Sequence, residues 1–166
     1  MKYTLLSTFI LIFSFYTNAF ALDITFADDD WDGVTIPNGQ QCQKFGGINP
    51  ATPRWIVSNI PIGSDTIILE YSDRDSKKMD KGGHGRMLFP ISPTATQTEI
   101  PSVPGHTFII PSQFAMIEAH RGAGWDIDGA YMPPCSGGKN HAYYVTIKTV
   151  KGDLITAEMV VEMGKY

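Results

Sequence analysis

Glycine and proline interrupt this chain so often that long helices have little room to form. The chain has 166 residues, of which 16 are Gly and 11 are Pro. Short segments rich in Val, Ile and Thr lie between these interruptions, which is typical of strands joined by turns. Segment 114–120 is expected to form one or two helical turns, and 90–105 an irregular connection. The spacing predicts strands over 22–26, 55–60, 66–71, 86–91, 107–110, 143–150 and 154–163.

These elements predict an all-β chain with antiparallel pairing, arranged as a β-sandwich with few short helices. Segment 66–71 has an apolar run too continuous for an edge strand, so it should be central and buried. No internal repeat or break in composition divides the chain, and its length suits one domain.

Composition excludes some classes of protein. Apolar residues make up 43% of the chain and charged residues 18%, which is a packed globular composition and argues against disorder. The formal net charge is −4 and no basic block occurs. We therefore expect no nucleic-acid partner.

The N-terminal segment has the pattern of a secretory signal peptide. Lys2 is the only charge before Asp23, an apolar run covers 5–16, and Ala19 and Ala21 are the small residues that a signal peptidase requires. The alternative is an uncleaved membrane anchor, but the run is shorter than the roughly 20 residues that span a bilayer. The sequence thus predicts a signal peptide over 1–21 and one domain over 22–166 with no transmembrane segment. The mature protein should be secreted or periplasmic.

Export changes the interpretation of the two cysteines. Cys42 and Cys135 are the only ones, and a lone pair in an oxidising compartment usually forms a disulfide. Two free buried thiols are the alternative.

Two acidic turns copy part of a calcium-binding loop. Asp28-x-Asp30-x-Asp32 opens like such a loop, but its twelfth position is Gly39 instead of glutamate. The turn at Asp126 is a shorter copy of the same pattern. Asp and Gly are also common in ordinary turns, so no metal site is predicted.

The sequence shows no catalytic or cofactor signature. The four histidines lack the spacing of a helical metal pair, no serine lies in a nucleophile elbow, and neither Gly-Gly pair opens a phosphate-binding loop. We therefore predict no catalytic residue and no cofactor.

One set of motifs is more specific because its parts occur in order. The turn over 61–66, Pro-Ile-Gly-Ser-Asp-Thr, opens the buried strand, which leads into Asp73-Arg74-Asp75. His84 follows nine residues after Asp75. Far downstream, Tyr131-Met-Pro-Pro-Cys precedes His141-Ala-Tyr143 at the start of another strand.

These motifs resemble the phosphatidylethanolamine-binding protein family, in its bacterial Raf-kinase-inhibitor-like branch. In that family a Pro-x-Gly-Thr-x-Ser turn leads a strand into Asp-Pro-Asp, a His follows at this spacing, and a Gly-Pro-Cys-Pro-Pro segment precedes His-Arg-Tyr. The resemblance runs from about Gly33 to the C-terminus. It implies an antiparallel β-sandwich with a small anion pocket at one end. By position it assigns ligand binding to Asp73, Asp75, His84, Tyr131, His141 and Tyr143.

The implied pocket chemistry is straightforward. Imidazole N–H groups would donate to oxygens of a phosphate or carboxylate, carboxylates would orient the imidazoles, and Tyr131 would belong to a rigid wall. The chain departs from the family pattern at several positions. Arg74 replaces the proline between the aspartates, Gly83 and Gly85 replace the aromatic residues beside the histidine, and Ala142 replaces arginine.

The resemblance favours a binding module for a small anion or a phospholipid headgroup, with action through a protein partner as a further option. It does not favour an enzyme. Two alternatives remain open: a secreted hydrolase with His84 or His141 as general base, and an effector that acts through its surface while the pocket is idle.

Overall fold

The computed structural model describes residues 21–166. All but the last residue of the predicted signal peptide therefore lies outside the described residues, and its cleavage stays a prediction. Within the described range, no helix combines the length and the apolar character that crossing a membrane requires.

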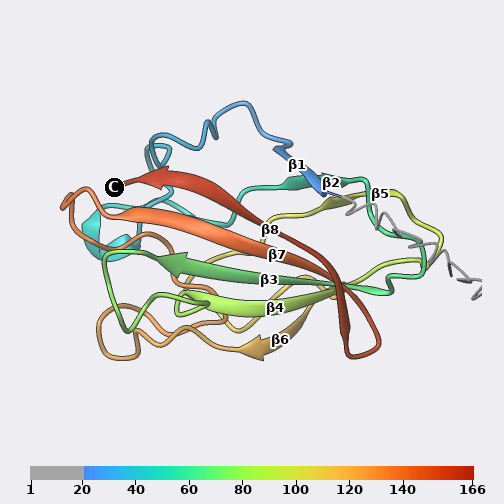
Figure 1. Cartoon of the computed structure of the whole chain (residues 1–166). Coiled ribbons are helices and arrows are strands. Elements are labelled where there is room, and N and C mark those ends of the chain that lie inside the picture. The colour runs from blue at the N-terminus through green and yellow to red at the C-terminus, as the bar shows by residue number, and fades with distance from the viewer. Residues whose placement is uncertain (1–20) are drawn as a thin grey trace, which may run out of the picture.

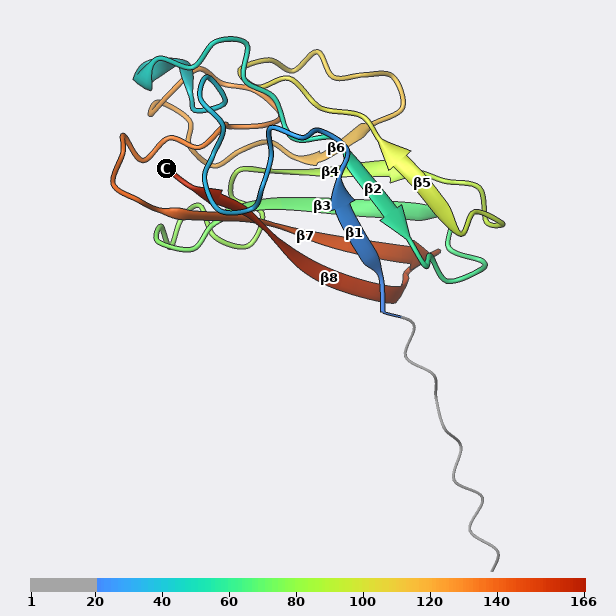
Figure 2. The same cartoon turned by 90° about the horizontal axis from the view of Figure 1, so that it is seen from above.

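Residues 21–166 form two antiparallel sheets (Figures 1 and 2). The first has the order β1-β2-β5, with β1 (Asp23–Phe26), β2 (Trp55–Ser58) and β5 (Gln97–Ile100). The second has the order β6-β4-β3-β7-β8, with β6 (Ala115–Glu118), β4 (Gly85–Pro90), β3 (Thr66–Asp73), β7 (Ala142–Lys151) and β8 (Leu154–Lys165). The described chain has one short 3-10 helix, η1 (Gln43–Phe45), so the all-β prediction is confirmed.

The core fills the space between the two sheets. Trp55 and Val57 of β2 meet Leu69 of β3 and Ile147 of β7 in one buried cluster. Alternate residues of each strand point to opposite faces, so every second side chain of these strands reaches the core. This burial of apolar surface is the main favourable contribution to stability.

The strand β3 lies at the centre of the larger sheet, as its apolar run predicts. Its outward face carries Glu70, which is nearly buried although charged. Arg86 of β4 and Lys148 of β7 each place a nitrogen 2.8 Å from its carboxylate. The two cations compensate the charge that would otherwise be costly to bury.

Three sequence predictions of local structure are wrong. Segment 107–110 forms no strand, and 114–120 contains the edge strand β6 instead of helical turns. The strand β5 lies within 90–105, where an irregular connection was expected. Both missed strands lie at a sheet edge, and only Ile100 of β5 is buried, so the alternation that marks a half-buried strand is absent.

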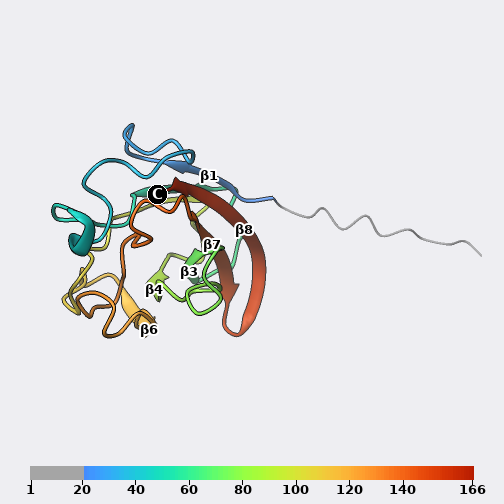
Figure 3. The same cartoon turned by 90° about the vertical axis from the view of Figure 1, so that its left-hand side faces the viewer.

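One end of the sandwich, which we call the loop end, carries the long connections. There β3 ends and β7 begins, and the connections 74–84 and 119–141 lie at the same end of the molecule as η1 (Figure 1, left). Figure 3 looks onto this end and shows β8 curving around it towards the C-terminus. At the opposite end, β7 and β8 are joined by a tight turn at Gly152.

Candidate binding cavity at the loop end

The ends of two adjacent strands bring the predicted site residues together. In the register of β3 with β7, Asp73 lies opposite Tyr143, and His141 immediately precedes β7. The His141 Nδ1 lies 2.7 Å from the Asp73 Oδ2, and the Asp73 side chain is only 5% exposed. Such a carboxylate fixes the orientation of an imidazole ring.

Asp75 holds the backbone beside this pair. The Asp75 main-chain N–H donates to the Asp73 Oδ1 at 2.8 Å, and the Asp75 Oδ2 accepts from the Ala142 N–H at 2.8 Å. Asp75 itself is exposed. Its carboxylate therefore joins the chain after β3 to the start of β7.

His84 is buried, and its tautomer follows from its partner. Its Nδ1 lies 2.6 Å from the Met132 carbonyl oxygen, which can only accept, so Nδ1 carries the hydrogen. Burial lowers the pKa of His84 to about 4, which keeps the ring neutral near pH 7. Its Nε2 has no hydrogen-bond partner among residues 21–166. The neutral ring thus has no free N–H to offer an anion, unlike the family-based expectation.

Tyr143 lies beside His84 with the two rings edge to face, 5.4 Å between centroids. Its hydroxyl accepts from the Cys135 main-chain N–H at 3.1 Å. Burial raises the pKa of Tyr143 to about 12, so the hydroxyl keeps its own hydrogen as a donor.

A cavity of about 300 Å³ lies between these groups. Four of the six predicted ligand-binding residues line it, namely Asp73, His84, His141 and Tyr143. Sequence reasoning missed the lysines in its lining, Lys78 and Lys139, and the aromatic ring of Trp125. All three lie on connections, where no periodic pattern shows which way a side chain points.

Tyr131 does not line this cavity. It is 1% exposed and packs against Tyr71 in the core, 5.0 Å between ring centroids. Its neighbour Met132 lines the cavity instead.

The glycines that replace the family's aromatic residues are required by close packing. A Cβ on Gly83 would lie 2.3 Å from the Met79 Cα, and one on Gly85 would lie 2.2 Å from the Ala130 oxygen. Gly85 also has a φ of +124°, which favours glycine. On the two sides of His84, the connection 74–84 thus packs too closely against Gly83, and the connection 119–141 too closely against Gly85, to leave room for a side chain.

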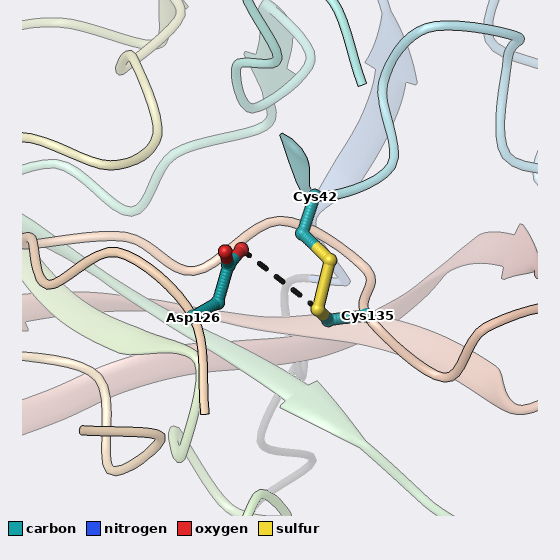
Figure 4. A group of neighbouring side chains, drawn as sticks. All are labelled: Cys42, Asp126 and Cys135. Carbon is teal, nitrogen blue, oxygen red and sulfur yellow. Dashed lines mark hydrogen bonds between the residues drawn. A yellow bond between two sulfur atoms is a disulfide. The ribbon is translucent and has the colours of Figure 1, made fainter. Parts of the chain in front are cut away.

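The predicted disulfide is confirmed. Cys42 and Cys135 are bonded across 93 residues (Figure 4). The Asp126 Oδ2 lies 3.8 Å from the Cys135 Sγ. Because a disulfide sulfur carries no hydrogen, this is a close contact without a shared proton while the bond is intact. Together with Asp126, the two cysteines could hold a metal ion only as free thiolates, which the disulfide excludes.

The acidic turn near the N-terminus has local partners. Arg54 binds the Asp28 carboxylate at 2.6 Å, and the Asp32 Oδ1 accepts the N–H groups of Val34 and Thr35. These contacts match the turn interpretation of the aspartates.

Comparisons with known proteins support the fold. No model of a known protein family matches the sequence, and no curated protein matches it either. Among solved structures, it is similar to one assigned as a phosphatidylethanolamine-binding protein homolog from Chlamydia trachomatis. The TM-score is 0.53 with 19% sequence identity, over 89% of this chain and 97% of the other. The chain therefore adopts the fold of the phosphatidylethanolamine-binding proteins.

Proposed function

We propose that the protein is a binding module that holds a small phosphate-containing anion in the cavity at the loop end. The observation that carries the proposal is the convergence of Asp73, His84, His141 and Tyr143 on one cavity from distant parts of the sequence. Asp73 and His141 are 68 residues apart, yet share a hydrogen bond.

The chemistry supports an anion more than a cation. In its protonated form, His141 shares one N–H with Asp73 and offers the other to a ligand oxygen. The Tyr143 hydroxyl is a second donor, and Lys78 and Lys139 add positive charge at the lining. Trp125 and Met132 supply apolar walls, as small-molecule sites commonly have.

We propose binding without catalysis. The Ser136 hydroxyl at the cavity donates to a main-chain oxygen of Tyr166, so no histidine activates it. A phospholipid headgroup and a free phosphate ester share the chemistry that this cavity would recognise.

The test is a titration with inorganic phosphate and with phosphoethanolamine, followed by NMR amide shifts. His141→Ala should weaken binding about tenfold or more, because it removes an N–H donor, and should lower the melting temperature only by the loss of its hydrogen bond to Asp73. Lys78→Ala should also weaken binding, whereas the neighbouring Lys77→Ala should not, since Lys77 does not line the cavity. Unchanged binding in the His84→Ala, His141→Ala double variant would place the site elsewhere.

Export belongs to the same proposal. The signal pattern and the disulfide support a secreted or periplasmic protein whose mature chain begins at Leu22. Mass spectrometry of the exported protein tests this, and recovery of the intact chain from membranes would contradict it.

A further inference from the structure

Residues 42–47, which we call the strap, contact two residues that line the cavity, Trp125 and Cys135. The Cys42 N–H donates to the Pro134 carbonyl oxygen at 2.9 Å. The Lys44 Nζ lies 3.7 Å from the centroid of the Trp125 ring and donates to the Trp125 carbonyl oxygen at 3.0 Å. The strap therefore contacts the connection 119–141 at two places besides the disulfide.

Cys135 joins the strap to the cavity lining. Its sulfur bonds to Cys42, its N–H donates to the Tyr143 hydroxyl, and its carbonyl oxygen accepts from the Trp125 indole N–H at 3.3 Å. Tyr143 and Trp125 both line the cavity. A shift of Cys135 would thus move two lining side chains.

Few other contacts hold the segment 136–140 that follows. Gly137 and Gly138 both have positive φ, and residues 137–140 are exposed. Within the described chain, no main-chain N–H of 137–140 donates a hydrogen bond, while Ser136 is held by its side chain and by hydrogen bonds to Tyr143. Lys139, a cavity lysine, belongs to this segment. Its position therefore depends strongly on Cys135.

We propose that the Cys42–Cys135 disulfide is a redox switch for ligand binding in this cavity. The intact bond holds Cys135, Trp125 and the segment 136–140 in the binding arrangement. Reduction releases these residues and lowers the affinity of the cavity for the anion. The inference rests on the proposed function, because it regulates the same site.

The reductant is a small thiol, and the exchange consumes two of them. A thiolate attacks the Cys135 Sγ, the bond to Cys42 breaks, and the Cys42 sulfur leaves as a thiolate and takes a proton. A second thiolate attacks the mixed disulfide, which yields the external disulfide and the Cys135 thiol after protonation. Attack occurs at Cys135 because it lines the cavity and is 5% exposed, whereas Cys42 is fully buried.

Asp126 gives the reduced state a hydrogen-bond acceptor. Its side chain is 5% exposed, and its Oδ2 already lies 3.8 Å from the Cys135 Sγ (Figure 4). The Cys135 thiol formed by reduction can donate to this carboxylate. On its other side, the same oxygen lies 3.4 Å from the His106 Nδ1. A buried thiol therefore finds a partner already in place.

The experiment compares the oxidised protein with the protein reduced by dithiothreitol, using inorganic phosphate as the probe. Affinity should fall about tenfold on reduction and return on reoxidation, because the lysine and wall contacts are lost. The Cys42→Ser, Cys135→Ser double variant should bind as weakly as the reduced protein and should not respond to dithiothreitol. Equal affinity in both redox states would overturn the switch.

A second measurement separates the switch from the proposed function. The Trp125 indole N–H resonance should shift on reduction while the amides of β3 keep their positions, and this needs no ligand. Absence of phosphate binding by the oxidised protein would defeat the proposed function and, with it, the regulation proposed here. If the oxidised protein does bind phosphate, an indole resonance that does not move on reduction would overturn the switch and leave the proposed function intact. So would a reduced protein that loses its sheet amide spectrum, because the switch requires a folded reduced state.

Discussion

The Asp73 Oδ2 and the His141 Nδ1 lie 2.7 Å apart although 68 residues separate them in the chain. The antiparallel register of β3 with β7 places Asp73 opposite Tyr143, so the residues just before β7 meet the end of β3. Asp73 is the last residue of the central strand β3, whereas His141 belongs to the connection before β7. Polar groups that flank a rigid scaffold in this way commonly carry function.

Replacing Asp73 by Asn should weaken phosphate binding and lower the free energy of unfolding by about 1–3 kcal/mol. The variant keeps the volume but replaces the carboxylate that accepts from the His141 Nδ1 by an amide. Chemical denaturation and phosphate titration measure the two effects. Asp23→Asn, at an exposed position of β1, is the control and should change neither quantity. An Asp73→Asn protein that binds like the parent would contradict the assigned role.

Stability should fall as pH falls from 6.5 towards 4. Burial lowers the folded-state pKa of His84 from 6.5 to about 4, so in this window the unfolded chain binds more protons than the folded protein. The free energy of unfolding should decrease by roughly 3 kcal/mol across it. Urea denaturation at several pH values checks this, and His84→Gln should flatten the dependence. If the unfolding free energy of the variant depends on pH as steeply as that of the parent, other groups cause the effect.

Substitutions of Tyr131 should affect stability, whereas removing the hydroxyl of Tyr143 should affect phosphate binding. Tyr131→Ala should cost about 3–5 kcal/mol of stability, because a fully buried ring in the core is removed. Tyr131→Phe, which keeps the ring, should leave phosphate affinity unchanged. Tyr143→Phe should weaken binding, since the cavity loses a donor and the Cys135 N–H loses its acceptor. Weaker binding in Tyr131→Phe than in Tyr143→Phe would restore the wall role that the family resemblance implies for Tyr131.

The purified protein should contain no free thiol under denaturing, non-reducing conditions. The Cys42–Cys135 disulfide closes a long loop, so the Cys42→Ser, Cys135→Ser variant should lose about 2–5 kcal/mol of unfolding free energy. Thiol titration and denaturation curves supply the measurements. Two titratable thiols per chain would show that the bond does not form in solution.

Some elements could be predicted from local sequence because burial leaves a pattern there. The apolar run over 66–71 indicated a central strand, and β3 lies at the centre of its sheet. The edge strands β5 and β6 carry no such pattern, because β6 is largely exposed and only one residue of β5 is buried. Their pairing with β2 and β4 decides their conformation.

The candidate site was likewise only partly predictable from the sequence. The motifs around Asp73, His84 and His141 could be recognised from residue types and spacing, and these residues meet at one cavity. It could not be predicted that Tyr131 lies in the core, or that Lys78, Lys139 and Trp125 line the cavity. Side chains on connections take their directions from contacts with segments far away in the chain.

By itself, the sequence determined the all-β class, the central position of β3 and the cysteine pair, because strand patterning and residue chemistry are local properties. Tertiary structure alone decided which nitrogen of His84 carries its hydrogen, since that depends on the Met132 carbonyl 48 residues away. It also decided that Cys135 contacts both Tyr143 and Trp125. Hydrogen bonds and burial between distant segments set these features, and no local pattern encodes them.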